Sequence, residues 1–179
     1  MITNGHMHSI IKKKPEIIIV DDHTIFRQGL KAIINYEDLG TIIGEASNGE
    51  EFIEQLTILK PDIVLMDIDM PLMDGFEATQ KALKIIPTLK IIAFTVFSEN
   101  EYSQKMIRCG AKGFILKSSG FYELENAIKT VMKGKSYFKN KIPRNNKRDI
   151  KSKDLIKTEE YKAKVSKEKK MLFFPWVVN

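Results

Sequence analysis

The sequence predicts an α/β protein: a doubly wound sheet of five parallel strands, with helices on both faces and a basic C-terminal tail. Two observations, read with a general rule of sheet topology, support this fold class. Five short apolar runs alternate with stretches whose apolar residues recur at helical spacing. Connections between parallel strands are right-handed and usually helical, so the alternation favours a parallel sheet that is covered on both sides. Most of the apolar runs end in polar residues, as strands do where they leave a buried sheet.

The predicted strands and helices alternate along the whole domain. Strands are expected, in chain order, at residues 16–20, 41–46, 63–66, 90–94 and 113–116. Helices are expected at residues 23–35, 50–59, 75–86, 99–108 and 121–132. Asn48 and Gly49 mark the start of the second helix. Pro87 stops the third helix and Gly110 closes the fourth. The third strand is apolar on both faces, as expected for a strand between two layers of helices.

Charge and periodicity divide the chain into three parts. Residues 1–15 are expected to be a flexible N-terminal segment, residues 16–137 the folded domain, and residues 138–179 a basic linker or tail. Residues 1–138 carry 16 lysines and arginines against 18 aspartates and glutamates, whereas residues 139–170 carry 13 against 5. The net charge of +6 therefore comes from the tail. Such a tail can contact nucleic acid or acidic partners, although most basic segments are simply solvated.

Composition also argues against several classes of protein. The single cysteine, Cys109, rules out an internal disulfide and fits a reducing compartment. No apolar run reaches the roughly 18 to 20 residues that a membrane-spanning helix needs. The first residues lack the basic and then apolar pattern of a signal peptide. We therefore predict a cytoplasmic protein without a membrane partner.

Polar side chains follow four of the five predicted strands. In chain order they are Asp21 and Asp22, Asp67, Thr95, and Lys117. Because the carboxyl ends of parallel strands meet at one edge of a sheet, we expect these five side chains to lie together. A single aspartate at a strand end is most often a turn residue or a helix cap. The prediction therefore rests on the combination and its order.

The predicted cluster suggests a chemistry. Carboxylates held together repel one another unless cations offset their charge. Lys117 can supply one cation and a divalent metal ion another, and a hydrated site with oxygen ligands suits Mg²⁺. The anion that fits such a site is a phosphoryl group. Asp67 would then be the nucleophile, Lys117 would neutralise the phosphoryl oxygens together with Mg²⁺, and the Thr95 hydroxyl would donate a hydrogen bond to one of them.

Residues from Glu16 to about Tyr137, roughly two-thirds of the chain, resemble the receiver domain of bacterial two-component response regulators. The motifs that carry the resemblance occur in the right order and spacing: Val20-Asp21-Asp22-His23, Asp67-Ile68-Asp69-Met70-Pro71-Leu72-Met73-Asp74-Gly75, Phe94-Thr95 and Gly110-Ala111-Lys112-Gly113-Phe114-Ile115-Leu116-Lys117. The resemblance implies a flavodoxin-like fold with strand order 2-1-3-4-5. It also implies a signalling switch that assists its own phosphorylation and dephosphorylation, and not a metabolic enzyme.

The resemblance assigns a role to each acidic residue. Asp67 would accept the phosphoryl group from a sensor histidine kinase or from a small phosphodonor. Asp22, Asp67 and the backbone carbonyl of Asp69 would bind Mg²⁺, and Asp21 would hold the ion through a water molecule. A second copy of the chain, giving a homodimer, is a further possible partner on which the sequence does not decide.

The resemblance also implies a switch made of Thr95 and Phe114. Thr95 would turn toward the phosphoryl group, the Phe114 ring would move into the vacated space, and the face formed by the fourth helix, fifth strand and fifth helix would change. The competing interpretation is that Phe114 is an ordinary core aromatic. Asp69 and Phe97 would flank the route of the hydrolytic water.

The motif at residues 110–119 is most similar to that of regulators of the LuxR and NarL type, whose output is a DNA-binding helix-turn-helix. Only 47 residues follow Met132, and they contain no recognisable domain of that kind. The tail is therefore expected to be a truncated or atypical output region, with room for one charged helix over residues 154–170.

Two alternative functions stay open at this point. The first is a transcriptional regulator that binds DNA through the tail or through a missing output domain. The second is a receiver-like module that binds proteins without phosphorylation. A phosphatase of the haloacid-dehalogenase type would also use an aspartate nucleophile, and Asp69 fits its spacing, but the Asp21-Asp22 pair and the switch residues do not.

Overall fold

The computed structural model describes residues 14–98 and 100–138. The chain divides into two units, Met1–Ile142 and Pro143–Asn179, and all described residues belong to the first. The predicted N-terminal segment and tail lie almost wholly outside the described residues, so these domain boundaries stay predictions. Within the described part, no helix combines the length and apolarity needed to span a membrane.

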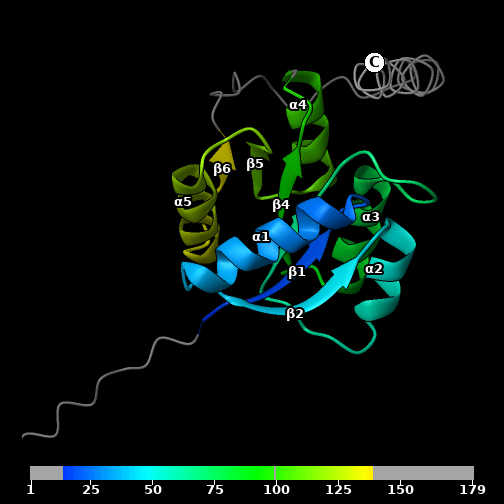
Figure 1. Cartoon of the computed structure of the whole chain (residues 1–179). Helices are drawn as coiled ribbons and strands as arrows, with labels where there is room; N and C mark the ends of the chain where they lie inside the picture. Colours follow the sequence, from blue (N-terminus) through cyan, green and yellow to red (C-terminus); the bar gives the residue numbers. More distant parts are fainter. Residues whose placement is uncertain (1–13, 99, 139–179) are drawn as a thin grey trace, which may run out of the picture. The chain divides into compact units, whose positions relative to one another are not determined.

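A parallel β-sheet forms the centre of the first unit (Figure 1). Its strands are β1 (Glu16–Val20), β2 (Thr41–Ala46), β3 (Ile63–Met66), β4 (Lys90–Thr95), β5 (Gly113–Leu116) and β6 (Tyr137–Phe138). They are arranged in the order β2-β1-β3-β4-β5-β6, and each neighbouring pair is parallel. The expected order of the first five strands is confirmed, and β6 is an addition to it. A strand of two residues has no periodicity from which it could be predicted.

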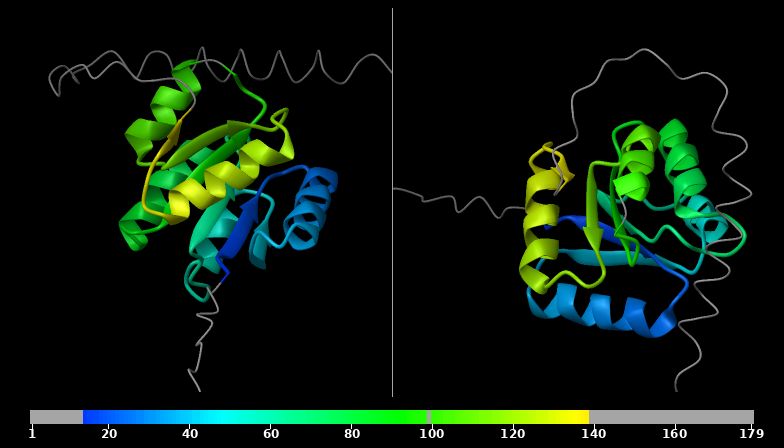
Figure 2. Two further views of the ribbon diagram at one scale, coloured as in Figure 1. Left: turned by 90° about the vertical axis from the view of Figure 1, so that its left-hand side faces the viewer. Right: turned by 90° about the horizontal axis from the view of Figure 1, so that it is seen from above.

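Five helices alternate with the first five strands and cover both faces of the sheet (Figure 2). They are α1 (Thr24–Tyr36), α2 (Gly49–Gln55), α3 (Gly75–Ile85), α4 (Asn100–Cys109) and α5 (Phe121–Met132). Ile34 of α1 and Ile128 of α5 belong to the core on one face. Phe52 of α2 and Ala82 of α3 belong to the core on the other face. Figure 2 shows α4 beside α3 on this second face. The doubly wound architecture is therefore confirmed.

The second helix begins as expected but is shorter than the sequence pattern indicates. The Asn48 side chain caps it by accepting a hydrogen bond of 3.0 Å from the Glu51 amide. The helix ends at Gln55 and not at residue 59. The amides of Thr57 and Ile58 each donate to a carbonyl three residues earlier, at 3.1 Å. The chain tightens into turns there, and this redirects it toward the central strand β3.

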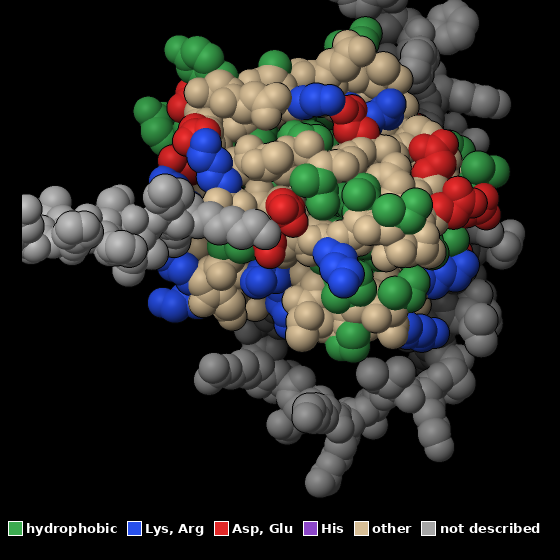
Figure 3. Space-filling model, turned by 90° about the horizontal axis from the view of Figure 1, so that it is seen from below, with side chains coloured by type: hydrophobic (Ala, Val, Ile, Leu, Met, Phe, Trp, Pro, Cys, Tyr) green, Lys and Arg blue, Asp and Glu red, His purple; other side chains and the backbone are tan. Residues whose placement is uncertain are grey.

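The neighbouring strands β1 and β3 are buried along nearly their whole length, with only Glu16, at the start of β1, partly exposed. Side chains over residues 17–20 of β1 and residues 63–66 of β3 are at most 1% exposed. A polar group without a partner would be strongly destabilising in this environment, so polar side chains begin only where the strands end. On the face of the molecule drawn in Figure 3, lysine and arginine side chains are interspersed with aspartate and glutamate.

Candidate functional site

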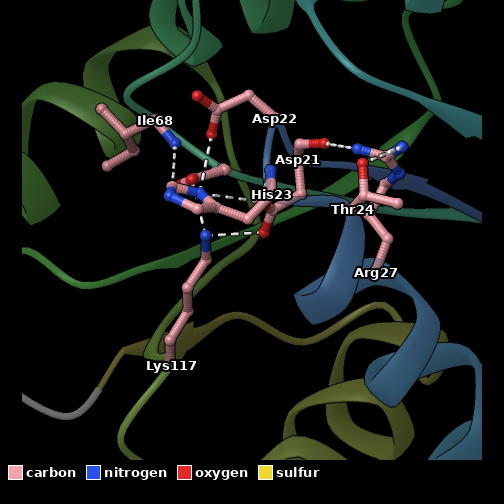
Figure 4. A network of polar contacts seen from close by, with 8 residues as sticks. Asp21, Asp22, His23, Thr24, Arg27, Ile68 and Lys117 are labelled. Carbon is pink, nitrogen blue, oxygen red and sulfur yellow. Dashed lines mark hydrogen bonds and ion pairs between the residues drawn. The ribbon is translucent and has the colours of Figure 1, made fainter.

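The carboxyl ends of four strands bring polar side chains to one edge of the sheet. Figure 4 shows Asp21, Asp22, His23 and Lys117 gathered there. Asp21 follows β1, Asp67 follows β3, Thr95 ends β4 and Lys117 follows β5. Asp21, Asp67 and Thr95 are only 2%, 4% and 0% exposed. Polar groups are rarely buried to this extent unless they are paired or have a function, so this edge is the candidate site.

Asp67 is held rigidly at the end of the central strand. Its amide donates a hydrogen bond of 2.8 Å to the Val20 carbonyl, which continues the pairing between β1 and β3. Its carboxylate oxygen Oδ1 accepts a hydrogen bond of 2.7 Å from the Ile68 amide. Oδ2 accepts one of 2.6 Å from the Lys117 ammonium. Both carboxylate oxygens are therefore oriented by the chain itself.

Lys117 joins two buried carboxylates. Its Nζ atom lies 2.6 Å from Oδ2 of Asp21 and 2.6 Å from Oδ2 of Asp67. The lysine side chain is only 7% exposed, and its ammonium lies 4.6 Å from the centre of the Phe26 ring. The Lys117 amide also donates to the Thr95 carbonyl at 2.7 Å, which fixes the start of the loop after β5. One cation thus offsets two negative charges in a nearly dry environment.

The pKa of the Asp67 carboxyl is raised above its ordinary value. Burial is the main cause, because it disfavours the ionised form. The Lys117 ammonium opposes this rise, whereas the nearby Asp21 carboxylate adds to it. A buried carboxyl whose pKa is perturbed by burial and by specific charged neighbours is a good candidate for a functional group.

The acidic residues form a cluster that also contains a histidine. One ligand atom from each of Asp21, Asp22, His23 and Asp67 lies within 4.8 Å of the others. The His23 Nδ1 atom is 2.9 Å from Asp22 Oδ1 and 3.5 Å from Asp21 Oδ1. The three carboxylates supply the oxygen ligands that Mg²⁺ prefers, so the cluster fits a divalent metal ion. The predicted ligand role of the Asp69 carbonyl, two residues beyond Asp67, stays a prediction.

Two residues of this region have no role in the sequence-based prediction. His23 stands directly after the two aspartates, and this adjacency is the signal that could have pointed to it. Arg27 lies one turn into α1 and donates a hydrogen bond to the backbone carbonyl of Asp21. Its guanidinium also lies 3.8 Å from the Glu45 carboxylate of β2. The helical spacing of α1 gives no sign of this contact with the end of β1.

The two predicted switch residues lie on neighbouring strands. The Thr95 hydroxyl accepts a hydrogen bond of 3.4 Å from the Phe97 amide. Phe114 is 8% exposed and is paired in the sheet with Ala93 of β4 and Phe138 of β6. Its burial agrees with both interpretations made from the sequence, so the switch role of Thr95 and Phe114 stays a prediction.

Comparison with known proteins places the chain in a family. The family model of the response regulator receiver domain matches residues 17–129. The response regulator GacA of Pseudomonas syringae pv. syringae is 36% identical over 127 residues, which are 71% of this chain and 59% of GacA. The oxygen regulatory protein NreC of Staphylococcus aureus is 38% identical over 128 residues, 71% of this chain and 59% of NreC. The match thus spans 59% of the length of these relatives.

Solved structures agree with this assignment. A LuxR-family two-component response regulator from Aurantimonas sp. SI85-9A1 is 27% identical and covers 86% of this chain and 99% of its own, with a TM-score of 0.67. The signal receiver domain of the response regulator NarL from Mycobacterium tuberculosis is also 27% identical and covers 69% of this chain and 99% of its own, with a TM-score of 0.64. The chain therefore belongs to the response regulator receiver-domain family.

Proposed function

We propose that the chain is a Mg²⁺-dependent phosphoacceptor that receives a phosphoryl group on Asp67 from a phosphohistidine of a sensor kinase. The observation that carries this proposal is the Lys117 ammonium, which lies 2.6 Å from both the Asp67 and the Asp21 carboxylate. A cation buried beside a rigid carboxylate is already placed to offset the charge of an incoming phosphoryl group. Family membership supports the same chemistry.

The proposed transfer is an in-line displacement at phosphorus. A carboxylate oxygen of Asp67 forms the new bond to phosphorus while the bond between phosphorus and the kinase histidine breaks. The imidazole leaves with that electron pair and takes up a proton. Before transfer, the Lys117 ammonium contacts both the Asp21 and the Asp67 carboxylate. Once Asp67 has bonded to phosphorus, the ammonium can contact the phosphoryl oxygens while it stays near Asp21.

Three carboxylates and one carbonyl would hold the metal ion. Asp22, Asp67 and the Asp69 carbonyl would be direct ligands, and Asp21 would act through water. When bound, Mg²⁺ supplies positive charge that stabilises the transferring phosphoryl group. The cluster of ligand atoms within 4.8 Å supports this assignment, as does the preference of Mg²⁺ for oxygen ligands.

We propose that the phosphoryl group then acts on the β4 and β5 side of the sheet. The Thr95 hydroxyl, which accepts a hydrogen bond from the Phe97 amide in this structure, would turn toward the phosphoryl oxygens. The Phe114 ring would move toward the space that Thr95 leaves. The resulting change at α4, β5 and α5 would be the signal that a partner or a second copy of the chain detects.

Intact-mass measurement tests the phosphoacceptor role. The protein is incubated with acetyl phosphate and Mg²⁺, alongside Asp67→Asn and the matched control Asp74→Asn. Asp74 lies in the same loop and caps α3 through a 2.8 Å hydrogen bond to the Glu77 amide, a function that asparagine retains. We expect one added phosphoryl group on the wild type and on the control, none on Asp67→Asn, and none when the metal is chelated.

Either of two results would contradict the proposal. The first is a phosphoryl group on Asp67→Asn equal in amount to that on the wild type. The second is no phosphoryl group on wild-type protein that is folded and shown to bind Mg²⁺.

A further inference from the structure

Three aromatic rings form a chain from the loop after β4 to the start of α3. The Phe97 ring, in the loop, is stacked on the Tyr102 ring of α4, with centroids 4.6 Å apart and planes 4° from parallel. Tyr102 is in turn stacked on Phe76 of α3 at 6.4 Å and 25°. The Lys105 ammonium lies 3.8 Å from the centre of the Phe76 ring. We call Phe76, Tyr102 and Phe97 the aromatic stack.

One end of the aromatic stack is connected directly to the candidate switch. Phe97 contributes its ring to the stack and its amide to the 3.4 Å hydrogen bond that the Thr95 hydroxyl accepts. Only one residue separates Phe97 from Thr95, so the position of the ring and the orientation of this amide are linked. Movement of the loop that frees the Thr95 hydroxyl would also displace the ring from Tyr102.

The other end of the aromatic stack is fixed. Phe76 is only 3% exposed. It follows Gly75, whose amide donates a hydrogen bond of 2.9 Å to the carbonyl of Ile68 in the loop that carries Asp67. Tyr102 therefore lies between an anchored residue beside the phosphoacceptor and a loop residue beside the switch. Its parallel contact with Phe97 is closer than its contact with Phe76.

We propose that Tyr102 is a positioning residue that holds the loop after β4 in the unphosphorylated arrangement through its stack on Phe97. The inference rests on the proposed function and names a residue that regulates it. In this arrangement the Thr95 hydroxyl is occupied by the Phe97 amide. In this proposal the loop shifts when the hydroxyl turns toward the phosphoryl group, and the two rings separate. The strength typical of a stacked aromatic pair corresponds to a shift of about two- to tenfold in the switch equilibrium.

The test replaces the ring while keeping the residue apolar. Tyr102→Leu removes the stack, and the matched control Tyr102→Phe keeps the ring and loses only the hydroxyl. We would measure the affinity of each protein for beryllofluoride in Mg²⁺, and the rate of phosphorylation by acetyl phosphate. We expect Tyr102→Leu to bind beryllofluoride about two- to tenfold more tightly and to be phosphorylated faster by a similar factor, with Tyr102→Phe equal to the wild type.

Thermal unfolding of each variant separates positioning from simple packing. If Tyr102 only contributes to packing, Tyr102→Leu lowers the melting temperature but leaves beryllofluoride affinity unchanged, and the inference is overturned. Should Tyr102→Leu fail to fold, Phe97→Leu removes the other ring of the same pair and is expected to tighten beryllofluoride binding in the same direction. Unchanged affinity in Phe97→Leu would likewise overturn it.

The inference and the proposed function fail in different ways. If the wild type takes no phosphoryl group, the proposed function is wrong. If the wild type is phosphorylated on Asp67 and Tyr102→Leu is phosphorylated at the same rate, only the positioning role is wrong. A double variant, Phe97→Leu with Tyr102→Leu, should show no larger effect than either single variant, because the second change removes a contact that is already lost.

Discussion

Helices α3 and α4 lie side by side on the same face of the sheet, but they are anchored differently (Figure 2). The buried residues of α3 are Gly75, Phe76, Ala78, Thr79 and Ala82. Its N-terminus is capped by Asp74, whose carboxylate accepts a hydrogen bond of 2.8 Å from the Glu77 amide. Helix α4 is one residue shorter, and its buried residues are Met106 and Cys109. The stability of α4 therefore depends on far less buried surface.

This difference in anchoring matches the two tasks that the proposed phosphorylation switch requires. Helix α3 begins against the loop of Asp67, and its first residue is a glycine because a side chain there would overlap the Asp67 carbonyl oxygen. Helix α4 is joined to the site through Tyr102 and Phe97. Regions with little buried apolar surface open most easily. We therefore expect α3 to hold the acceptor in place and α4 to carry the response.

The largest loss of stability is expected when the charge balance around Asp67 and Asp21 is broken. Lys117→Met removes the ammonium that lies between two carboxylates that are 3% and 4% exposed. Two buried carboxylates are then left without a cation, which typically destabilises a protein by about 3 to 5 kcal/mol. Urea unfolding of Lys117→Met without divalent metal ions measures this loss.

A double variant provides the control for that experiment. Asp67→Asn combined with Lys117→Met leaves one buried carboxylate in place of two, so part of the lost stability should return. A loss of less than about 1 kcal/mol in Lys117→Met would show that the ammonium does not hold the site together.

Gly75→Ala is expected to be the next largest perturbation, because it pushes α3 away from the Asp67 loop. The added Cβ would meet the Asp67 carbonyl oxygen well inside van der Waals contact. Overpacking typically destabilises a protein by about 1 to 3 kcal/mol, and we expect the upper end here because the clash is with backbone. Gly29→Ala is the matched control, since it lies in α1 with nothing within 4 Å of its Cβ position and should stabilise the protein by about 0.5 to 1 kcal/mol. Equal stabilities for the two variants would contradict the predicted close packing.

Amide hydrogen exchange tests the comparison of the two helices directly. We expect the amides in the middle of α4 to exchange roughly tenfold faster, or more, than those in the middle of α3 in the unphosphorylated protein. Helix α5, which buries Leu124, Ala127, Ile128 and Val131, is the internal reference and should exchange slowly, like α3. Protection of α4 equal to that of α3 would remove the basis for assigning the response to α4.

The smallest effect is expected in the pH dependence of stability. Burial raises the pKa of the Asp67 carboxyl in the folded protein. Between the ordinary pKa of aspartate and this raised value, the folded state binds a proton that the unfolded state releases. Stability therefore falls as the pH rises through this interval, and Asp67→Asn removes that part of the pH dependence. Urea unfolding from about pH 4 to about pH 7 without divalent metal ions tests this, and a steeper fall in Asp67→Asn would contradict it.

Much of the fold follows from local sequence patterns. The apolar runs that became β1 and β3 are short and apolar on both faces, and their burial is complete. The order of polar residues after successive strands was enough to place Asp21, Asp67 and Lys117 together, because parallel strands fix which ends meet. The contact of one lysine with both carboxylates was not predictable, since it depends on the side-chain conformation of Lys117.

The features that sequence analysis did not predict depend on how loops and helices are placed relative to one another. The contact of His23 with Asp22 depends on how the loop after β1 turns. The stack of Phe97 on Tyr102 requires the loop after β4 and the first turn of α4 to meet at one angle. No periodicity encodes either arrangement.

Chemical trapping of the phosphoryl group tests the central claim most directly. The wild-type protein is phosphorylated with acetyl phosphate in Mg²⁺, treated with borohydride to reduce any acyl phosphate, and digested for peptide mass mapping. The account predicts conversion of Asp67 to homoserine, with Asp21, Asp22 and Asp69 unchanged. Conversion at a different aspartate, or a phosphorylated chain with no conversion at all, would contradict the assignment of Asp67 as the acceptor.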